Sequence, residues 1–324
     1  MPLQVIFVVI FREQRALMVV TYTSNEFSRL GLELVGYTRQ RQERTRFKTN
    51  QRRFKSNFSC GPRACRAAFL DLQTTNIAAA RIDDPNVRFF LIAVHWMAVY
   101  RTEEQMAGIF DRDEKTLRQQ IRRYVTALAA LKAQKIVWDV VAQDPAIVPL
   151  TVDTVHFSVD EPRLFPSAGW FDQKSAGSGL SYEVGVAIHA NQIAWTCGAF
   201  MGSADDRTIL KGEERMLDDN GRPSDDPYEC LWDKLGNKKA IGDRLYKGVV
   251  QAKILIRNRH DSSIVKRFKR YCRARHENVN ARIKAFSALS GTFRHKVKKH
   301  RTVFHACVVL VQYDAENGHP FWDV

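Results

Sequence analysis

The chain has 324 residues, of which 45% are hydrophobic and 26% charged. This composition excludes a chain that is disordered throughout, and the length suits two domains or one large domain with an accessory, at about 100–200 residues per domain. Fifty Lys and Arg against thirty-five Asp and Glu leave a net charge of +15, which favours an anionic polymer such as nucleic acid as partner over a merely soluble basic protein.

Residues 1–84 form a basic N-terminal region that the sequence leaves poorly assigned. The apolar run 3–11 is too short to cross a membrane and lacks the flanks of a signal peptide, so we expect a first strand or a misplaced gene start. Residues 39–57 are almost continuous charge and amide. They fit a nuclear-import signal or a phosphate-binding arm, and equally well a solvated linker.

Residues 87–135 have the pattern of three helices. The run 87–100 is apolar nearly all round, which predicts a buried helix. Thr102 and Gln105 form a capping-box pattern that opens a short second helix. Asp113 can cap a third helix after a break at 111–113.

The third helix is amphipathic. Its apolar stripe consists of Leu117, Ile121, Val125 and Leu128. Its opposite side carries Lys115, Arg118 and Arg122. A short helix, a tight turn and a basic helix are the parts of a helix-turn-helix that binds DNA, although a plain helical bundle with a solvated basic face explains the same pattern.

From residue 148 the hydrophobic period changes to that of strands. The runs 148–159, 182–190 and 193–200 are rich in β-formers and are separated by turn residues. Residues 207–216 resemble a short helix, 240–243 are the end of a short strand, and 252–257 are expected to form another strand. Residues 262–289 predict one long basic helix, and a last helix should begin near Val303. The order predicts a mixed α/β domain.

Three acidic residues stand out in this basic chain. Asp153 lies inside an apolar strand, and Asp243 ends another. A carboxylate buried there costs several kcal/mol unless something neutralises it, and a divalent metal is one neutraliser. Glu277 lies on a helix crowded with arginines, where an ordinary salt bridge is the simpler explanation. Each acid alone is a weak candidate ligand, since buried capping aspartates are common.

Phosphodiester chemistry would explain three converging carboxylates, because two metal ions can activate the attacking oxygen and stabilise the leaving one. The cations around Glu277 would hold the phosphate backbone. No P-loop, GxSxG or HExxH motif occurs, so NTP-driven, serine-hydrolase and zincin mechanisms are not indicated. The six cysteines contain no CxxC pair, which argues against a zinc ribbon.

The order of these stretches resembles the DDE transposases of the PIF/Harbinger superfamily over about residues 88–324. The resemblance rests on the stretches 152–157 (VDTVHF), 172–174 (DQK) with 179–183 (GLSYE), 202–207 (GSADDR), 242–248 (GDRLYKG) and 275–284 (RHENVNARIK), followed by 293–295 and 300. Thirty-four positions separate Asp243 from Glu277, a spacing within the range of that superfamily. The sequence departs from the family pattern at Asp205, where His is common, and at 244–245, where small residues are common.

The resemblance implies an RNase H-like catalytic domain at 148–324, with a mixed sheet flanked by helices. It is preceded by the helix-turn-helix-like DNA-binding region at 85–140. The family pattern implies that Asp153, Asp243 and Glu277 are catalytic and hold two Mg²⁺ or Mn²⁺ ions. The first two would bridge both ions, and Glu277 would complete the site of one. Strand cleavage at transposon ends and strand transfer would follow.

Four basic residues are candidate phosphate contacts or, equally, solvated surface charges. They are Lys174, Arg275, Arg282 and Lys284. His156 and His276 are expected to pack or to support ligands rather than to bind metal themselves.

The expected partner is DNA, both transposon ends and target, in the nucleus. The resemblance also implies a separate Myb-like DNA-binding protein as a possible accessory partner. The oligomeric state stays open, and a homo-oligomer is possible. No membrane partner is expected. Three hypotheses stay open: an active transposase, a domesticated nuclease that no longer transposes, and a catalytically inactive DNA-binding protein.

Overall fold

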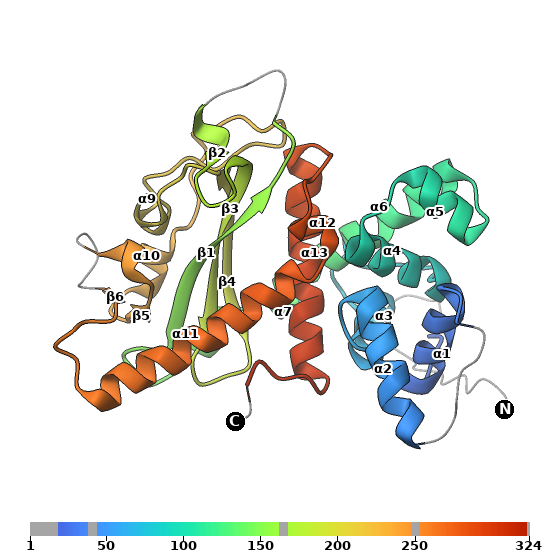
Figure 1. Cartoon of the computed structure of the whole chain (residues 1–324), viewed down its shortest axis with the longest axis horizontal. Coiled ribbons are helices and arrows are strands. Elements are labelled where there is room, and N and C mark those ends of the chain that lie inside the picture. The colour runs from blue at the N-terminus through green and yellow to red at the C-terminus, as the bar shows by residue number, and fades with distance from the viewer. Residues whose placement is uncertain (1–18, 38–43, 162–167, 248–252, 323–324) are drawn as a thin grey trace. The chain divides into compact units, whose positions relative to one another are not determined.

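The computed structural model describes residues 19–37, 44–161, 168–247 and 253–322 (Figure 1). Its contacts divide the chain into two compact units. The helical unit comprises Met1–Lys132 with His305–His319. The sheet unit comprises Ala133–Phe304 with Pro320–Val324.

The helical unit is built from helices that the N-terminal half of the chain supplies in order. They are α1 (Ser24–Leu34), α2 (Arg44–Phe58), α3 (Pro62–Thr74), α4 (Val87–Val99), α5 (Glu103–Phe110) and α6 (Glu114–Ala130). The second half of α13 (Val297–Glu316) belongs to the same unit. The apolar run at 87–100 is the buried helix α4, as predicted.

The helix starts follow the predicted caps. The Thr102 hydroxyl accepts from the Gln105 backbone N–H at 3.3 Å, and the Gln105 side chain accepts from the Thr102 N–H at 3.2 Å. The Asp113 carboxylate accepts from the Thr116 N–H at 2.8 Å and opens α6. The predicted apolar stripe of α6 is buried, whereas Lys115, Arg118 and Arg122 are exposed. These local signals are confirmed because each cap satisfies backbone groups that a helix end leaves free.

Residues 44–58 form helix α2, so the solvated-linker interpretation is wrong for this segment. Phe54 and Phe58 fall four residues apart on one side of a strongly polar helix, and both are fully buried. Their rings stack with centroids 4.3 Å apart. Two aromatic anchors at this spacing bury one face of a helix even when its other side is almost wholly charged. Residues 3–11 and 39–43 lie outside the described residues.

Aromatic side chains from four helices form the centre of the helical unit. The rings of Phe27 and Phe69 lie 5.7 Å apart, those of Phe69 and Phe90 5.3 Å, and those of Phe90 and Tyr124 6.0 Å. All four side chains are almost completely buried. Tilted and edge-to-face pairs at these distances add to the free energy of burying the rings.

The sheet unit contains a six-stranded mixed sheet in the described residues. Its strands are β1 (Leu150–Ser158), β2 (Phe171–Asp172), β3 (Gly177–Ala187), β4 (Ile193–Met201), β5 (Ala240–Ile241) and β6 (Ile254–Leu255). β1 is central: it pairs antiparallel with β3 and parallel with β5. β3 pairs with β4, and β6 extends the sheet beyond β5. The predicted mixed α/β architecture is therefore confirmed for this unit.

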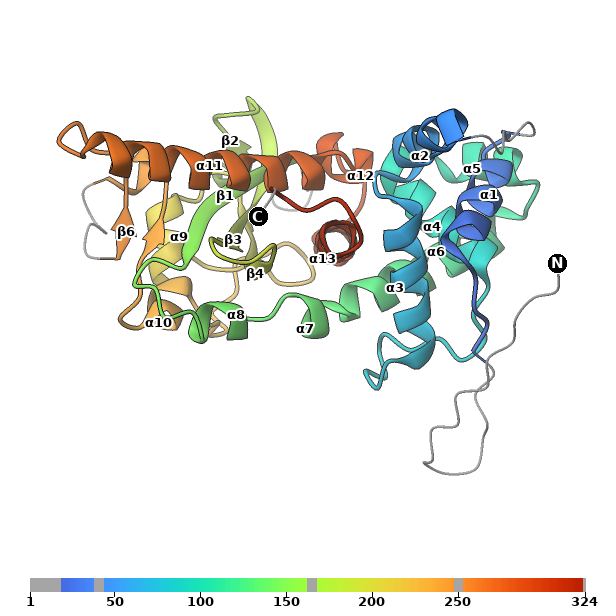
Figure 2. The same cartoon turned by 90° about the horizontal axis from the view of Figure 1, so that it is seen from below.

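Helices cover both faces of this sheet. α11 (Ser263–Lys284) crosses one face, and α8 (Asp139–Ala142) and α10 (Leu231–Leu235) lie on the other (Figure 2). The latter face buries an apolar core in which Val152 and Phe200 meet Leu231 and Leu235. Short helices α7 (Lys132–Lys135), α9 (Asp206–Lys211) and α12 (Ser287–Ser290) complete the set, with the 3₁₀ turns η1 (Ala168–Trp170) and η2 (Arg244–Tyr246).

Three predicted helices differ in length from those observed. The last helix, expected to begin near Val303, is α13, which begins at Val297. The helix expected over 207–216 is α9, which ends at Gly212 in a left-handed conformation with φ 74°. The single helix expected over 262–289 breaks after Lys284, and Phe286 is fully buried before α12 begins. Among the described helices, none has the length and apolarity needed to span a bilayer.

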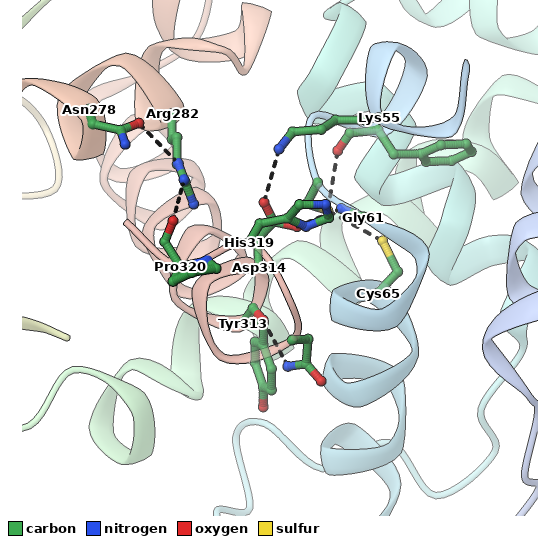
Figure 3. Close-up of polar contacts among 12 residues, drawn as sticks. Lys55, Gly61, Cys65, Asn278, Arg282, Tyr313, Asp314, His319 and Pro320 are labelled. Carbon is green, nitrogen blue, oxygen red and sulfur yellow. Dashed lines mark hydrogen bonds and ion pairs between the residues drawn. The ribbon is translucent and has the colours of Figure 1, made fainter. Parts of the chain in front are cut away.

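A buried carboxylate joins α13 to the rest of the helical unit (Figure 3). Asp314 accepts from the backbone N–H of Gly61 at 2.8 Å, and it lies 3.3 Å from Lys55 Nζ and 2.9 Å from His319 Nδ1. Its side chain is only 3% exposed. Burial raises the pKa of Asp314, but the contacts with His319, Lys55 and Gly61 outweigh it and hold the pKa below its usual range.

We predict that Asp314→Asn destabilises the protein by about 2 kcal/mol at pH 7, because hydrogen bonds to a charged group are lost while Lys55 keeps its charge. Since the folded-state pKa is lowered, the stabilisation is complete above the unfolded value of about 3.9 and is lost as pH falls through the folded pKa. Urea unfolding of wild type and variant at pH 7 and pH 3 measures this. Asp83→Asn, which removes an exposed partner of Arg81, is the matched control; an Asp314 effect equal to that of the control, or one that does not shrink between pH 7 and pH 3, would contradict the assignment.

Candidate active site

Asp153 lies near the middle of the central strand β1, on the side that faces α11. Asn280 Nδ2 donates to Asp153 Oδ2 at 3.0 Å, and two residues earlier on the strand Thr151 Oγ1 lies 2.8 Å from His276 Nδ1. Two residues of a strand span about 6.7 Å, and four residues of a helix span about 6 Å. The two spacings match, so α11 is fastened to β1 at two successive points.

Asp243 follows β5, the strand that pairs in parallel with β1, and it comes close to Asp153 through this pairing. Leu150 pairs with Ala240 and Thr151 with Ile241 in parallel register, and the same offset of 90 residues continues to Asp153 and Asp243. The strand pairing ends before that point, where Asp243 caps η2 by accepting from the Leu245 N–H at 2.7 Å. The cap fixes the direction of the carboxylate, and Tyr246, three residues after Asp243, is fully buried.

Glu277 is carried by α11 on the same helical face as Asn280. Its side chain is 62% exposed and lies 3.8 Å from Arg273, one turn earlier. Arg273, Glu277, Asn280 and Lys284 recur at helical spacing, so one row along α11 faces the two aspartates.

The three predicted carboxylates line a single cavity of about 580 Å³. The cavity also contains the cations Lys174, Arg273 and Lys284. Near Lys174, Asp172 accepts from the Lys174 N–H at 3.0 Å and from the Ser175 N–H at 3.2 Å. The structure therefore brings together side chains that lie 124 positions apart in the sequence, from Asp153 to Glu277.

The electrostatics of the cavity centre on Asp153. Burial, and then the charges of Asp243, Glu277 and Asp206, raise the pKa of Asp153 to about 7, while Lys174 lowers it. Carboxylates gathered in this way disfavour one another's charged forms unless a cation joins them. His276 is not a competing cation: burial, and then Arg273, lower its pKa to about 3.

The carboxylates are suited to a divalent cation, although no group of three metal-ligating side chains is assembled among the described residues. Each acid is held by its own neighbour: Asn280 for Asp153, the Leu245 N–H for Asp243 and Arg273 for Glu277. Hard divalent cations prefer oxygen ligands, and the charge repulsion at Asp153 is what such an ion would relieve. Coordination by all three side chains would require them to approach from these positions.

Two of the predicted phosphate contacts lie outside the cavity. Arg282 donates to the Pro320 carbonyl at 2.7 Å and to Asn278 Oδ1 at 3.2 Å, as Figure 3 shows. Arg275 donates to the Ile188 carbonyl at 3.1 Å and lies 4.5 Å from the centre of the Trp322 ring. Both arginines are on the side of α11 that is turned away from the row containing Glu277. The other two predicted contacts in this unit, Lys174 and Lys284, line the cavity.

The sequence analysis missed Arg273, Asn280 and Asp206 as members of this neighbourhood. Arg273 and Asn280 stand four residues before and three residues after Glu277, so helical spacing could have identified them once Glu277 was chosen. Asp206 belongs to the stretch 202–207 that carries the resemblance, but its place near the other acids depends on the tertiary packing of α9 and could not be deduced from the sequence.

Residues 152–312 match the family model described as DDE superfamily endonuclease. The matched region begins one residue before Asp153 and includes Asp243 and Glu277. Searches of curated proteins and of solved structures gave no match. A DDE superfamily endonuclease domain indicates a transposase or nuclease function, and the mixed sheet flanked by helices is consistent with the fold of such a domain.

We predict that Asp153 titrates near pH 7 in the protein without added metal, and that Asp243→Asn lowers its pKa. The variant removes a neighbouring negative charge but leaves the burial, so the pKa should fall only part of the way to about 3.9. The pH dependence of the Asp153 carboxyl ¹³C chemical shift measures both values. Asp160→Asn, at an exposed position outside the cavity, should leave the titration unchanged; a wild-type pKa near 4 would disprove the charge coupling.

Proposed function

We propose that the protein is a DDE transposase or endonuclease that hydrolyses phosphodiester bonds of DNA in an RNase H-like domain, with Asp153, Asp243 and Glu277 as catalytic residues. The observation that carries the proposal is the meeting of these three carboxylates at one cavity. It gains support from the match of residues 152–312 to DDE superfamily endonucleases. A PIF/Harbinger relationship is the finer proposal, and it rests on the ordered sequence stretches that resemble that superfamily.

The three carboxylates would hold Mg²⁺ or Mn²⁺, two ions in a complete site. Such ions activate the attacking oxygen and stabilise the leaving oxygen of a phosphodiester. Asp153 and Asp243 are suited to be shared ligands because they follow the register of adjacent strands, and Glu277 would complete one site from α11. Asn280 keeps the Asp153 carboxylate oriented, and the Leu245 N–H does the same for Asp243.

The reaction would proceed by two displacements at phosphorus. In the first, water attacks the phosphorus of the phosphodiester. The bond between phosphorus and the 3′-oxygen breaks, which leaves a 3′-hydroxyl and a 5′-phosphate. In the second, that 3′-hydroxyl attacks the phosphorus of a target phosphodiester, the bond from this phosphorus to the target's own 3′-oxygen breaks, and the target strand is left with a free 3′-hydroxyl. No covalent intermediate with the protein is needed, which agrees with a cavity that offers carboxylates and cations as its charged groups.

Basic side chains at the cavity would hold the DNA backbone. Lys174, Arg273 and Lys284 line it, and Arg270 continues their row along α11 as an exposed residue. Arg275 and Arg282 were predicted from the sequence as further contacts. Their hydrogen bonds to backbone carbonyls and their positions over aromatic rings favour a structural role instead.

The α5–α6 pair is proposed as a second DNA-binding element of the helix-turn-helix type. Lys115 and Arg122 are exposed on α6, and Arg118 pairs with Glu103 of α5 at 2.7 Å. Such a basic helix after a short turn can contact the major groove.

With DNA as substrate and a charge of +15, we propose that the protein acts in the nucleus. The intact set of acids disfavours an inactive DNA-binding protein, whereas a domesticated nuclease remains the alternative to an active transposase.

We predict that Asp153→Asn abolishes Mg²⁺- or Mn²⁺-dependent nicking of DNA and leaves DNA affinity within about twofold. The reason is that the neutral amide cannot replace a bridging carboxylate, while basic side chains dominate binding to phosphates. Nicking assays on DNA that carries the terminal repeats of the element, with a parallel binding titration, test this. Asp160→Asn is the matched control and should cut normally; equal loss of affinity and cleavage in Asp153→Asn would refute the assigned role.

We also predict that Lys284→Ala and Arg282→Ala have different effects, although both remove one charge from the same turn of α11. Lys284→Ala should weaken DNA binding and reduce the slope of log affinity against log salt concentration by about 1, as expected for one lost phosphate contact. Arg282→Ala should lower the melting temperature and leave the slope unchanged. A slope that changes equally in both variants would instead support the sequence-based assignment of Arg282 as a phosphate contact.

A further inference from the structure

Asp206 is a buried carboxylate that the proposed reaction does not use. It is the first residue of α9, is 5% exposed, and its Oδ2 atom is buried without a hydrogen-bond partner. A charged group in that state is costly, and retaining it calls for an explanation.

The start of α9 does not need Asp206. The preceding residue, Asp205, supplies the cap by accepting from the Arg207 N–H at 2.8 Å, and it also pairs with the Arg207 guanidinium at 2.7 Å. Asp205 lies at the surface and meets the usual requirements of a helix N-terminus. Two consecutive acids therefore have different surroundings: one caps the helix at the surface, and the other points into the interior.

The interior position of Asp206 is next to the candidate active site. Burial raises the pKa of Asp206, whereas Lys174 and the Thr154 hydroxyl lower it and Asp243 raises it further. Asp206 in turn contributes to the raised pKa of Asp153. Thr154 follows Asp153 on β1, so its side chain leaves the opposite side of the strand. Ile209 and Leu210 of α9 pack in one apolar core with Val152, whose side chain leaves β1 on the same side as that of Thr154. Asp206, on the same helix, accordingly lies behind the strand whose front carries Asp153.

A fourth acid at this place adds to the repulsion among the carboxylates when no cation is bound to them. The same charge becomes favourable when a divalent cation is bound, because it acts across a poorly solvated interior rather than through water. Groups that hydrogen-bond to metal ligands tune affinity without touching the ion, and replacing them costs about 10–100-fold; we expect an effect of similar size from a buried charge behind the ligands.

We propose that Asp206 is a positioning residue for the metal site: its buried carboxylate lies behind Asp153 and Asp243 and strengthens their hold on a divalent cation. The proposal rests on the proposed function, because it assumes that Asp153 and Asp243 are metal ligands. Asp206 is not a ligand in this scheme, and it does not line the cavity.

The test is a titration of the full-length protein with Mn²⁺ alone, in which electron paramagnetic resonance reports the free ion. We expect Asp206→Asn to weaken Mn²⁺ binding by about 10–100-fold without lowering the melting temperature, because the variant removes a buried charge that is costly to the fold. Asp205→Asn is the matched control, one residue away and of the same chemistry, and should stay within about twofold of wild type. Asp206→Ser is a second neutral variant, used if the amide prevents folding, because Ser is well tolerated at a helix start.

Asp153→Asn distinguishes a failure of the Asp206 proposal from a failure of the proposed metal site. If it weakens Mn²⁺ binding while the neutral Asp206 variant binds like Asp205→Asn, the inference about Asp206 is wrong and the proposed metal site stands. If Asp153→Asn binds Mn²⁺ as tightly as wild type, the proposed metal site is itself wrong, and the role of Asp206 is overturned with it. Weakening by both Asp153→Asn and Asp206→Asn, without weakening by Asp205→Asn, is the supporting result.

Discussion

The double attachment of α11 to β1 is the interaction on which the candidate site depends. Thr151 meets His276, and Asp153 accepts from Asn280, so a step of two residues on the strand matches a step of four on the helix. His276 and Asn280 are buried at these contacts. Without this match Glu277, between the two attachment residues on α11, would have no fixed position relative to Asp153. The attachment thus places Glu277, which is distant in sequence, next to the central strand β1.

The second constraint is the concentration of negative charge in a basic protein. Burial raises the pKa of Asp153, and the negative charges of three other acids raise it further, to about 7. One cation of the cavity, Arg273, pairs with Glu277, whereas Asp153 and Asp243 accept hydrogen bonds from the Asn280 amide and the Leu245 N–H. An arrangement of this kind is costly as a purely structural feature and becomes favourable when divalent cations and a phosphate backbone are added.

Local signals in the sequence predicted a large part of the fold. The caps at Thr102 and Asp113 and the alternation around Asp153 were read correctly because each depends on neighbours in the chain. Helix α2 was not predicted because its sequence is almost wholly polar, and its one buried face depends on only two phenylalanines. The orientation of Arg282 also could not be deduced, because the Pro320 carbonyl that binds it is distant in sequence. The role suggested for Asp206 likewise follows from tertiary packing alone.

The central claim is that carboxylates from β1, from the end of β5 and from α11 act together on one divalent centre. A crystal of the protein grown with Mn²⁺, with anomalous diffraction used to locate the ions, tests it most directly. The account predicts an anomalous peak in the cavity with oxygens of Asp153 and Asp243 at about 2 Å, and Glu277 bound to that ion or to a second one beside it. Mn²⁺ bound elsewhere, with these three side chains left in their separate hydrogen bonds, would contradict it.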